Sequence, residues 1–244
     1  MRARWTAIAL LLAAVLQGRA QPVPTPTPTA GTPPDAREAA ALLEQGRSNL
    51  QEAPLERALL YYSSRPGDPD AVRACARIDY YRALGEDSRK QRDRAKKILD
   101  EGIGWAQQAV RSDPGSGPAH ALLADLYGEK IALGDVFTAM DIGPKDAQEN
   151  EKALSLAPLD AGVLAAQGRR YLMAPDFAGG DPRKALVFFR RSLEADPDSD
   201  ETWLWLARAC RRLKDPAGFQ QALDKARSLD PQNVQVEWEA EKKP

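Results

Sequence analysis

The sequence has 244 residues, of which 34 are Lys or Arg and 35 are Asp or Glu, giving a formal net charge of −1. That balance gives no electrostatic support for nucleic acid or an anionic membrane as a partner. No glycine-rich phosphate loop or Cys/His cluster with metal-ligand spacing occurs, and His120 is the only histidine. We therefore expect a non-enzymatic protein without metal or cofactor, in which His120 is a packed or rim side chain.

Residues 1–20 have the organisation of a secretory signal peptide. Arg2 and Arg4 precede the apolar run Trp5–Leu16, and small residues stand at the two cleavage-determining places of Gly18–Ala20. The apolar run is about 12 residues long, short of the roughly 20 that span a bilayer as a helix. We predict export to the periplasm or the exterior, without stable membrane insertion after cleavage. Retention of the segment as an anchor is the alternative.

Residues 21–35 form a predicted linker. Prolines alternate there with Thr and Ala. Proline fixes φ and removes amide donors, so the segment favours an extended polyproline II conformation without a core. We expect it to act as a spacer before a single helical domain over residues 36–231.

The two cysteines, Cys75 and Cys210, are 135 positions apart in the sequence. An oxidising compartment would permit a disulfide between them. Each, however, stands among apolar residues with helical spacing, where a free cysteine packs as a small hydrophobic side chain. We favour two separate buried thiols over a bridge.

An internal repeat is the main signal. A helix-like apolar stretch ends in Asp-Pro or Ala-Pro at Pro114, Pro158, Pro197 and Pro231, at intervals of 44, 39 and 34 residues. Proline stops a helix because it lacks the amide hydrogen and clashes with the preceding turn. Four similar endings indicate tandem units of related structure.

The last interval contains two amphipathic helices. A Ser199 or Asp200 cap precedes the first, and Asp215-Pro216 starts the second. Two helices with apolar faces and a short turn bury those faces only by pairing and then stacking on neighbours. Repeated hairpins of this kind predict an α-solenoid. The apolar positions are Trp203, Leu206, Ala207, Cys210 and Leu213 in the first helix, and Phe219, Ala222, Leu223, Ala226 and Leu229 in the second.

These units resemble the tetratricopeptide repeat. In the last unit Trp203, Leu206 and Ala207 match the aromatic, aliphatic and small positions of the family's first helix, and Pro231 matches its terminal proline. Further matches are Leu223 and Ala226 in that unit, Gly168, Tyr171, Ala185, Phe189 and Pro197 in the unit before it, and Leu123, Ala124, Tyr127, Ala153 and Pro158 in the earliest clear unit. Departures from the pattern are Phe219, Gln167, Asp146 and Asn150.

Helical patterns also precede the clear units, but they follow the repeat loosely. We interpret them as a degenerate repeat and a half at the start of the array. With the three clear units, they predict an all-α superhelix of about four to five helical hairpins. The upstream stretches are Ala36–Leu50, Leu55–Ser64, Asp70–Leu84 and Ser88–Arg111.

The final residues, 232–244, form a predicted charged C-terminal tail. One possibility is a short helix that covers the last hairpin, with Val234, Val236 and Trp238 on its inner side. The other is a frayed end.

Two units exceed 34 residues, and we place the extra length in the turns within their hairpins, at Gly134–Pro144 and Ala174–Gly180. The second turn contains Phe177, Gly179 and Gly180 before Asp181-Pro182. This Pro-x-x-x-Gly-Gly-Asp phrase, followed by Lys-Ala, resembles a segment of the TatT family of exported tetratricopeptide-like proteins associated with TRAP transporters. The resemblance implies an accessory role in solute transport.

In solenoids of this type the first helices of successive hairpins line the concave face. Arg169 and Arg208 occupy equivalent places in adjacent repeats. At a separation of about 10 Å they would bind carboxylates through the planar set of N–H donors on each guanidinium. The alternative is that they pair with Asp125, Asp200 or Glu201 in solvent. Helical phase places on this face Ala121, Asp125, Ala165, Arg169, Leu204 and Arg208, with Arg212 one turn further.

Two functions follow from these patterns. The first is an exported scaffold that binds a protein or peptide partner, such as an acidic or C-terminal segment, on the concave face. The second is a TatT-like transport accessory that binds a small ligand or a substrate-binding protein. A helical-repeat fold constrains shape more than function, so the partner itself stays open.

Overall fold

The computed structural model describes residues 33–242, which belong to one compact unit. The predicted signal peptide and residues 21–32 of the predicted linker lie outside the described residues. Within residues 33–242 the chain forms eleven α-helices, one short 3-10 helix and no strand, which confirms the all-α prediction. No helix in this range is both long and apolar enough to cross a membrane.

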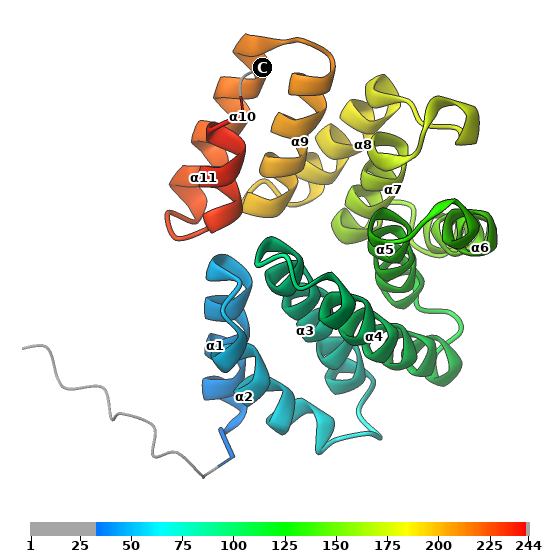
Figure 1. Ribbon diagram of the computed structural model, residues 1–244, viewed down its shortest axis with the longest axis vertical. Helices are drawn as coiled ribbons and strands as arrows, with labels where there is room; N and C mark the ends of the chain where they lie inside the picture. Colours follow the sequence, from blue (N-terminus) through cyan, green and yellow to red (C-terminus); the bar gives the residue numbers. More distant parts are fainter. Residues whose placement is uncertain (1–32, 243–244) are drawn as a thin grey trace, which may run out of the picture. The chain divides into compact units, whose positions relative to one another are not determined.

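Ten of the helices pair in sequence as five hairpins, and one short helix follows the last pair (Figure 1). The 3-10 helix Asp176–Ala178 lies in the connection between α7 and α8. The α-helices are α1 Ala36–Asn49, α2 Glu52–Ser63, α3 Pro69–Ser88, α4 Arg92–Ser112, α5 Gly117–Leu133, α6 Val136–Leu156, α7 Ala161–Met173, α8 Pro182–Ala195, α9 Asp200–Arg212, α10 Pro216–Leu229 and α11 Val234–Ala240.

Side-chain caps fix where the later helices begin. Ser199 accepts a hydrogen bond from the Thr202 amide, and the Asp181 and Asp215 carboxylates accept from amides in the first turns of α8 and α10. Pro182 and Pro216 stand in those first turns, where the missing amide hydrogen has no helical partner to lose. The sequence signals for these three helix starts are confirmed.

The N-terminal part contains two complete hairpins, α1–α2 and α3–α4, so the expectation of a repeat and a half is wrong. The extra length at Gly134–Pro144 is also placed differently from the prediction. The turn after α5 is short because the Asp135 carboxylate caps α6 by accepting from the Thr138 amide. The added residues therefore extend α6, which continues through Pro144.

Glycine and a large side chain meet where the two helices of a hairpin cross. A Cβ atom on Gly168 of α7 would lie 2.6 Å from the ring of Phe189, which is fully buried in α8. A Cβ atom on Gly46 of α1 would lie 2.4 Å from the side chain of Leu55 in α2. The absence of a side chain at these positions lets the paired helices pack closely.

The array of helices closes on itself within the described unit. The first helices of the hairpins, α1, α3, α5, α7 and α9, pack successively along the inner side, and α11 returns to contact α1 (Figure 1). Val234 at the start of α11 packs against the cluster that holds Leu43 and Leu50 of the first hairpin. The concave face is therefore the inside of a closed ring of helices.

The C-terminal tail contains a helix, α11, rather than a fully frayed end. Val236 is buried and packs into the core of the last hairpins, and the Glu239 carboxylate is also buried. Trp238 is 41% exposed, so the expectation that it faces inward is wrong. The reason is helical phase, because Val236 and Glu239 occupy the inner side of this short helix.

The two cysteines and the single histidine are packed side chains. Cys75 and Cys210 are free, buried thiols, as the sequence favoured, and burial raises the pKa of Cys75 to about 12. His120 is buried, with Nε2 donating to the Pro114 carbonyl and Nδ1 against the Glu149 carboxylate.

Candidate binding site on the concave face

A cavity of about 410 Å³ lies inside the ring, among the inner helices. Its wall combines small residues with charged and aromatic ones. Ala121 of α5 and Ala165 of α7 leave room at two adjacent repeats, in the positions that helical phase predicts. The other wall residues with a bearing on binding are Arg73, Arg77, Tyr80, Tyr81, Asp125, Arg169, Glu201 and Trp205.

Arg169 of α7 and Asp125 of α5 form a bidentate ion pair. Arg169 Nε donates to Asp125 Oδ1 at 2.8 Å, and Nη2 donates to Oδ2. Burial alone would lower the pKa of Arg169, but the neighbouring Asp125 carboxylate outweighs it and the pKa is raised. Both residues lie on the wall, and each already satisfies the other. The structure thus has the alternative considered for Arg169, in which its guanidinium pairs with Asp125.

Arg208 and Arg212 do not lie on the cavity wall. Arg208 Nε is 3.3 Å from Glu239 Oε2 of α11, and its guanidinium carbon lies 4.3 Å from the Trp205 ring centroid. Arg212 donates to the Leu172 carbonyl at the end of α7. The predicted carboxylate grip by Arg169 and Arg208 is therefore absent, because each guanidinium has its own partner in the protein.

The sequence prediction was also wrong in placing Leu204 on the concave face. Leu204 is 2% exposed and belongs to the core cluster that includes Val236 of α11. Leu204 therefore belongs to the core that α9 forms with α8, α10 and α11 instead of projecting into the concave face.

Arg77 of α3 is the functional candidate that the sequence prediction missed. Its side chain is exposed on the cavity wall, where the nearby Tyr81 and Glu201 raise its pKa, and within residues 33–242 it has no ion pair. It also borders a second hollow of about 390 Å³ beside α1 and α2. The available signal was the four-residue spacing of Arg73, Arg77 and Tyr81, which places the three residues on one side of α3.

Acidic and aromatic groups line the cavity beside Arg77. Tyr81 donates its hydroxyl hydrogen to Glu201 Oε1 at 2.7 Å, joining α3 to α9. Burial, followed by the nearby Glu201 charge, raises the pKa of Tyr81. Trp205 stacks on Phe189 with ring centroids 6.4 Å apart, so its indole is anchored in the core while bordering the cavity. The site thus offers a cation, a fixed carboxylate and an aromatic surface.

The predicted insertion between α7 and α8 lies in an exposed connection. Phe177 is 93% exposed. Gly179 has a φ of 88°, and a Cβ atom on Gly180 would lie 1.9 Å from the Ala174 carbonyl oxygen, so both positions require glycine. The connection is separate from the cavity wall, and its binding role stays a prediction.

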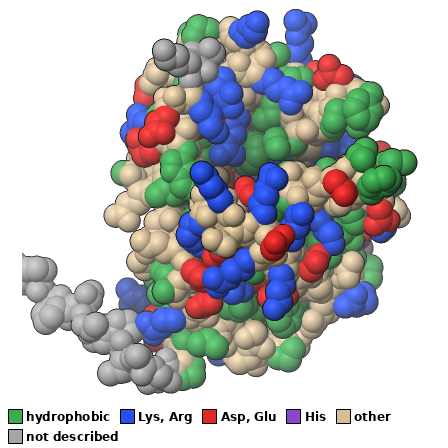
Figure 2. Space-filling model, in the orientation of Figure 1, with side chains coloured by type: hydrophobic (Ala, Val, Ile, Leu, Met, Phe, Trp, Pro, Cys, Tyr) green, Lys and Arg blue, Asp and Glu red, His purple; other side chains and the backbone are tan. Residues whose placement is uncertain are grey.

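On the face drawn in Figure 2, basic and acidic side chains are interspersed.

Comparison with known proteins agrees with this architecture. A tetratricopeptide-repeat family model matches residues 176–237. The structure of a thermophilic tetratricopeptide-repeat protein from Thermus thermophilus is similar, with a TM-score of 0.59 and 17% identity over 83% of this chain and 93% of that chain. YrrB, a tetratricopeptide-repeat protein with an unusual peptide-binding site, gives a TM-score of 0.40 and 16% identity over 84% of this chain and 100% of that one. No curated protein matches the sequence.

The similarity to the Thermus thermophilus protein, at 17% identity, shows the fold alone. The similarity to YrrB is weaker and supports no further conclusion. The family match covers α8, α9, α10 and most of α11, where the sequence repeat is clearest. The same hairpin geometry continues back to α1. Residues 176–237 therefore match the tetratricopeptide repeat, and the described chain as a whole has the fold of a tetratricopeptide-repeat solenoid.

Proposed function

We propose that this protein is a non-enzymatic scaffold that binds a protein or peptide partner in its concave cavity. The tetratricopeptide fold is typical of protein–protein interaction scaffolds. The observation that carries the proposal is Arg77, an exposed guanidinium on the cavity wall without an ion pair in the described chain. A guanidinium offers a carboxylate two parallel hydrogen bonds. An acidic or C-terminal peptide segment fits this site.

The test is affinity capture with the purified protein, comparing the wild type with Arg77→Glu. Arg111→Glu is the matched control, because Arg111 is exposed at the end of the outer helix α4 and lies off the cavity wall. We expect a partner that the wild type and Arg111→Glu both capture and Arg77→Glu loses. Equal capture by all three proteins would reject the cavity as the binding site.

We further propose that the protein works in the periplasm or outside the cell. Support comes from the sequence of residues 1–20, with its basic start, apolar run and small residues at the cleavage position. Mass spectrometry of the protein from fractionated cells tests this proposal. A mature N-terminus at Gln21 in the exported fraction is expected, and an intact N-terminus in the cytoplasmic fraction would contradict it.

A second candidate is a transport accessory that binds a small ligand, as the TatT resemblance implies. The volume of the cavity favours it, since about 410 Å³ lies within the range of roughly 300–1,000 Å³ typical of small-molecule sites. Native mass spectrometry of the purified protein distinguishes the two. An adduct that disappears in an Ala165→Trp variant would support a small ligand, because Ala165 lines the cavity. A spectrum without any adduct would favour the scaffold.

A further inference from the structure

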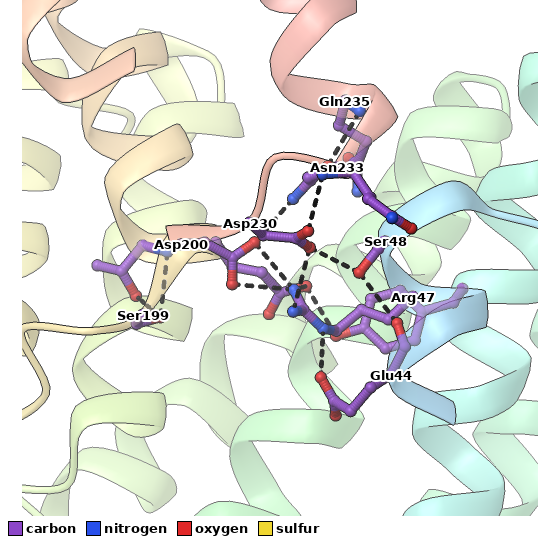
Figure 3. A network of polar contacts seen from close by, with 12 residues as sticks. Glu44, Arg47, Ser48, Ser199, Asp200, Asp230, Asn233 and Gln235 are labelled. Carbon is purple, nitrogen blue, oxygen red and sulfur yellow. Dashed lines mark hydrogen bonds and ion pairs between the residues drawn. The ribbon is translucent and has the colours of Figure 1, made fainter. Parts of the chain in front are cut away.

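The ring is closed by a polar seam between α1 and the C-terminal helices, with Arg47 at its centre (Figure 3). Arg47 Nη1 donates to both carboxylate oxygens of Asp200, at 3.0 and 3.1 Å, and Nη2 lies 3.5 Å from Asp230 Oδ2. Ser48 donates to the same Asp230 oxygen at 2.6 Å, and Asn233 Nδ2 donates to Asp200 at 2.8 Å. One arginine thus joins residues more than 150 positions apart in the chain.

The seam differs in chemistry from the contacts between neighbouring hairpins. Those contacts include ion pairs such as Arg169–Asp125, but they also bury large apolar clusters, as in the one that joins Phe189 to Leu204 and Leu223. At the seam, the side chains of Arg47 and Asp200 are 13% and 11% exposed, and the apolar contribution comes from Val234. When ionic groups separate, their hydration offsets much of the lost interaction. When an apolar interface separates, its surface is exposed to water and no new interaction compensates for the loss. The seam is therefore the boundary of the ring that opens most readily.

The seam also forms one end of the concave cavity. Glu201 follows Asp200 in the first turn of α9, lies 4.0 Å from Arg47 and borders the cavity. Tyr81 holds the same carboxylate from α3. Arg47 of α1 covers the outer side of Glu201, so movement of α1 away from α9 would expose this end of the cavity.

We propose that Arg47 determines which ligands the concave cavity accepts. With the seam closed, the cavity admits a short ligand that enters by its end. With the seam open, a longer continuous segment can lie across the inner helices. This inference rests on the proposed function only in taking the cavity as the binding site, and both experiments below work without a partner.

The first experiment measures opening of the seam by pulsed electron paramagnetic resonance. Spin labels are attached to Gln45→Cys in α1 and Gln232→Cys before α11, both exposed positions. Cys75 and Cys210 are buried and serve as unreactive background. Arg47→Glu replaces the cation by another negative charge beside Asp200 and Asp230, and we expect a longer and broader distance distribution than in the wild type.

The matched control is Arg57→Ala. Arg57 pairs with Glu38 at 2.7 Å and joins α2 to α1, away from the seam. We expect it to retain the narrow wild-type distribution. Arg47→Ala decides the outcome if Arg47→Glu loses helicity by circular dichroism. A wild-type distance distribution in the helical Arg47 variant would overturn the proposal.

The second experiment measures access to the cavity. The Ala165→Cys variant is treated with iodoacetamide or with a maleimide that carries a long polyethylene glycol chain. The reaction of the bulky reagent follows the open population, so we expect Arg47→Ala to accelerate it about tenfold or more. Iodoacetamide should react at a similar rate in both proteins. Equal acceleration of both reagents would show general loosening and would reject a selective closure.

These outcomes are separate from those of the proposed function. If partner capture depends on Arg77 while both Arg47 experiments give wild-type results, the binding site stands and the closure is wrong. If the Arg47 variants open the ring but Arg77 has no effect on capture, the closure stands and the proposed site is wrong.

Discussion

Arg169 of α7 and Asp125 of α5 hold each other through two hydrogen bonds on the concave wall, with the Nε–Oδ1 distance at 2.8 Å. Their side chains are 17% and 15% exposed. A pair in this position ties two adjacent repeats together on the inner side of the ring. Removing one member leaves the other as a largely buried charge without a partner.

Arg169→Ala should therefore destabilise the protein by roughly 2–4 kcal/mol. Urea unfolding followed by circular dichroism measures the change. Arg183→Ala is the control, because Arg183 is exposed and has no ion pair within residues 33–242; it should change stability by less than about 0.5 kcal/mol. The Asp125→Ala, Arg169→Ala double variant should lose less than the sum of the single losses. Additive effects would mean that the pair contributes no coupling.

Asp146 of α6 makes stability depend on pH. Burial raises the pKa of this carboxyl to about 7, although Arg170 Nε lies 3.6 Å away and opposes the shift. The folded state then binds the proton more tightly than the unfolded chain does, since the usual pKa is 3.8. The contribution of Asp146 to stability is consequently largest at low pH and falls as the pH rises from about 4 to 7.

Asp146→Asn imitates the protonated form and should raise stability at pH 8 by roughly 1–3 kcal/mol. The gain should shrink towards zero near pH 4. Thermal unfolding of both proteins across this pH range checks the prediction. A gain that is constant with pH, or a loss at pH 8, would show that the ionised carboxylate is favourable in the fold.

Gly168 tests the close approach of α7 and α8. An alanine Cβ there would lie 2.6 Å from the buried Phe189 ring. Overpacking of this kind should cost about 1–3 kcal/mol, more than the gain of about 1 kcal/mol from a better helix former. Gly104→Ala in α4 is the matched control, because nothing lies within 4 Å of its added Cβ. We expect Gly104→Ala to stabilise and Gly168→Ala to destabilise in the same thermal assay. The opposite order would contradict the packing.

The helices were predictable because their signals are local. The stretch Ala36–Leu50 contains α1, Ala36–Asn49, and the cap at Asp215 is correctly located. The closure of the ring was not predictable, because the pairing of Arg47 with Asp200 joins helices at opposite ends of the array. No short-range pattern in the sequence records that contact.

The errors at Leu204 and Arg208 share one physical cause. The prediction placed Leu204 and Arg208 on the open face of α9 without allowing for α11, which packs onto the last hairpin. Leu204 consequently joins the core with Val236, and Arg208 pairs with Glu239. Arg77 was missed because it lies in α3, where the sequence follows the repeat loosely. The predicted positions at Ala121 and Ala165 do line the cavity, since α5 and α7 have no such cover.

The most direct measurement is the affinity of the captured partner for Arg77 variants by isothermal titration calorimetry at two salt concentrations. We expect the order wild type, Arg77→Lys, Arg77→Ala, Arg77→Glu, with a loss of about 2 kcal/mol or more for Arg77→Glu. Arg111→Glu should bind like the wild type, and salt should weaken the wild type more than Arg77→Ala. Equal affinities for the wild type and Arg77→Glu would contradict a partner site in the concave cavity.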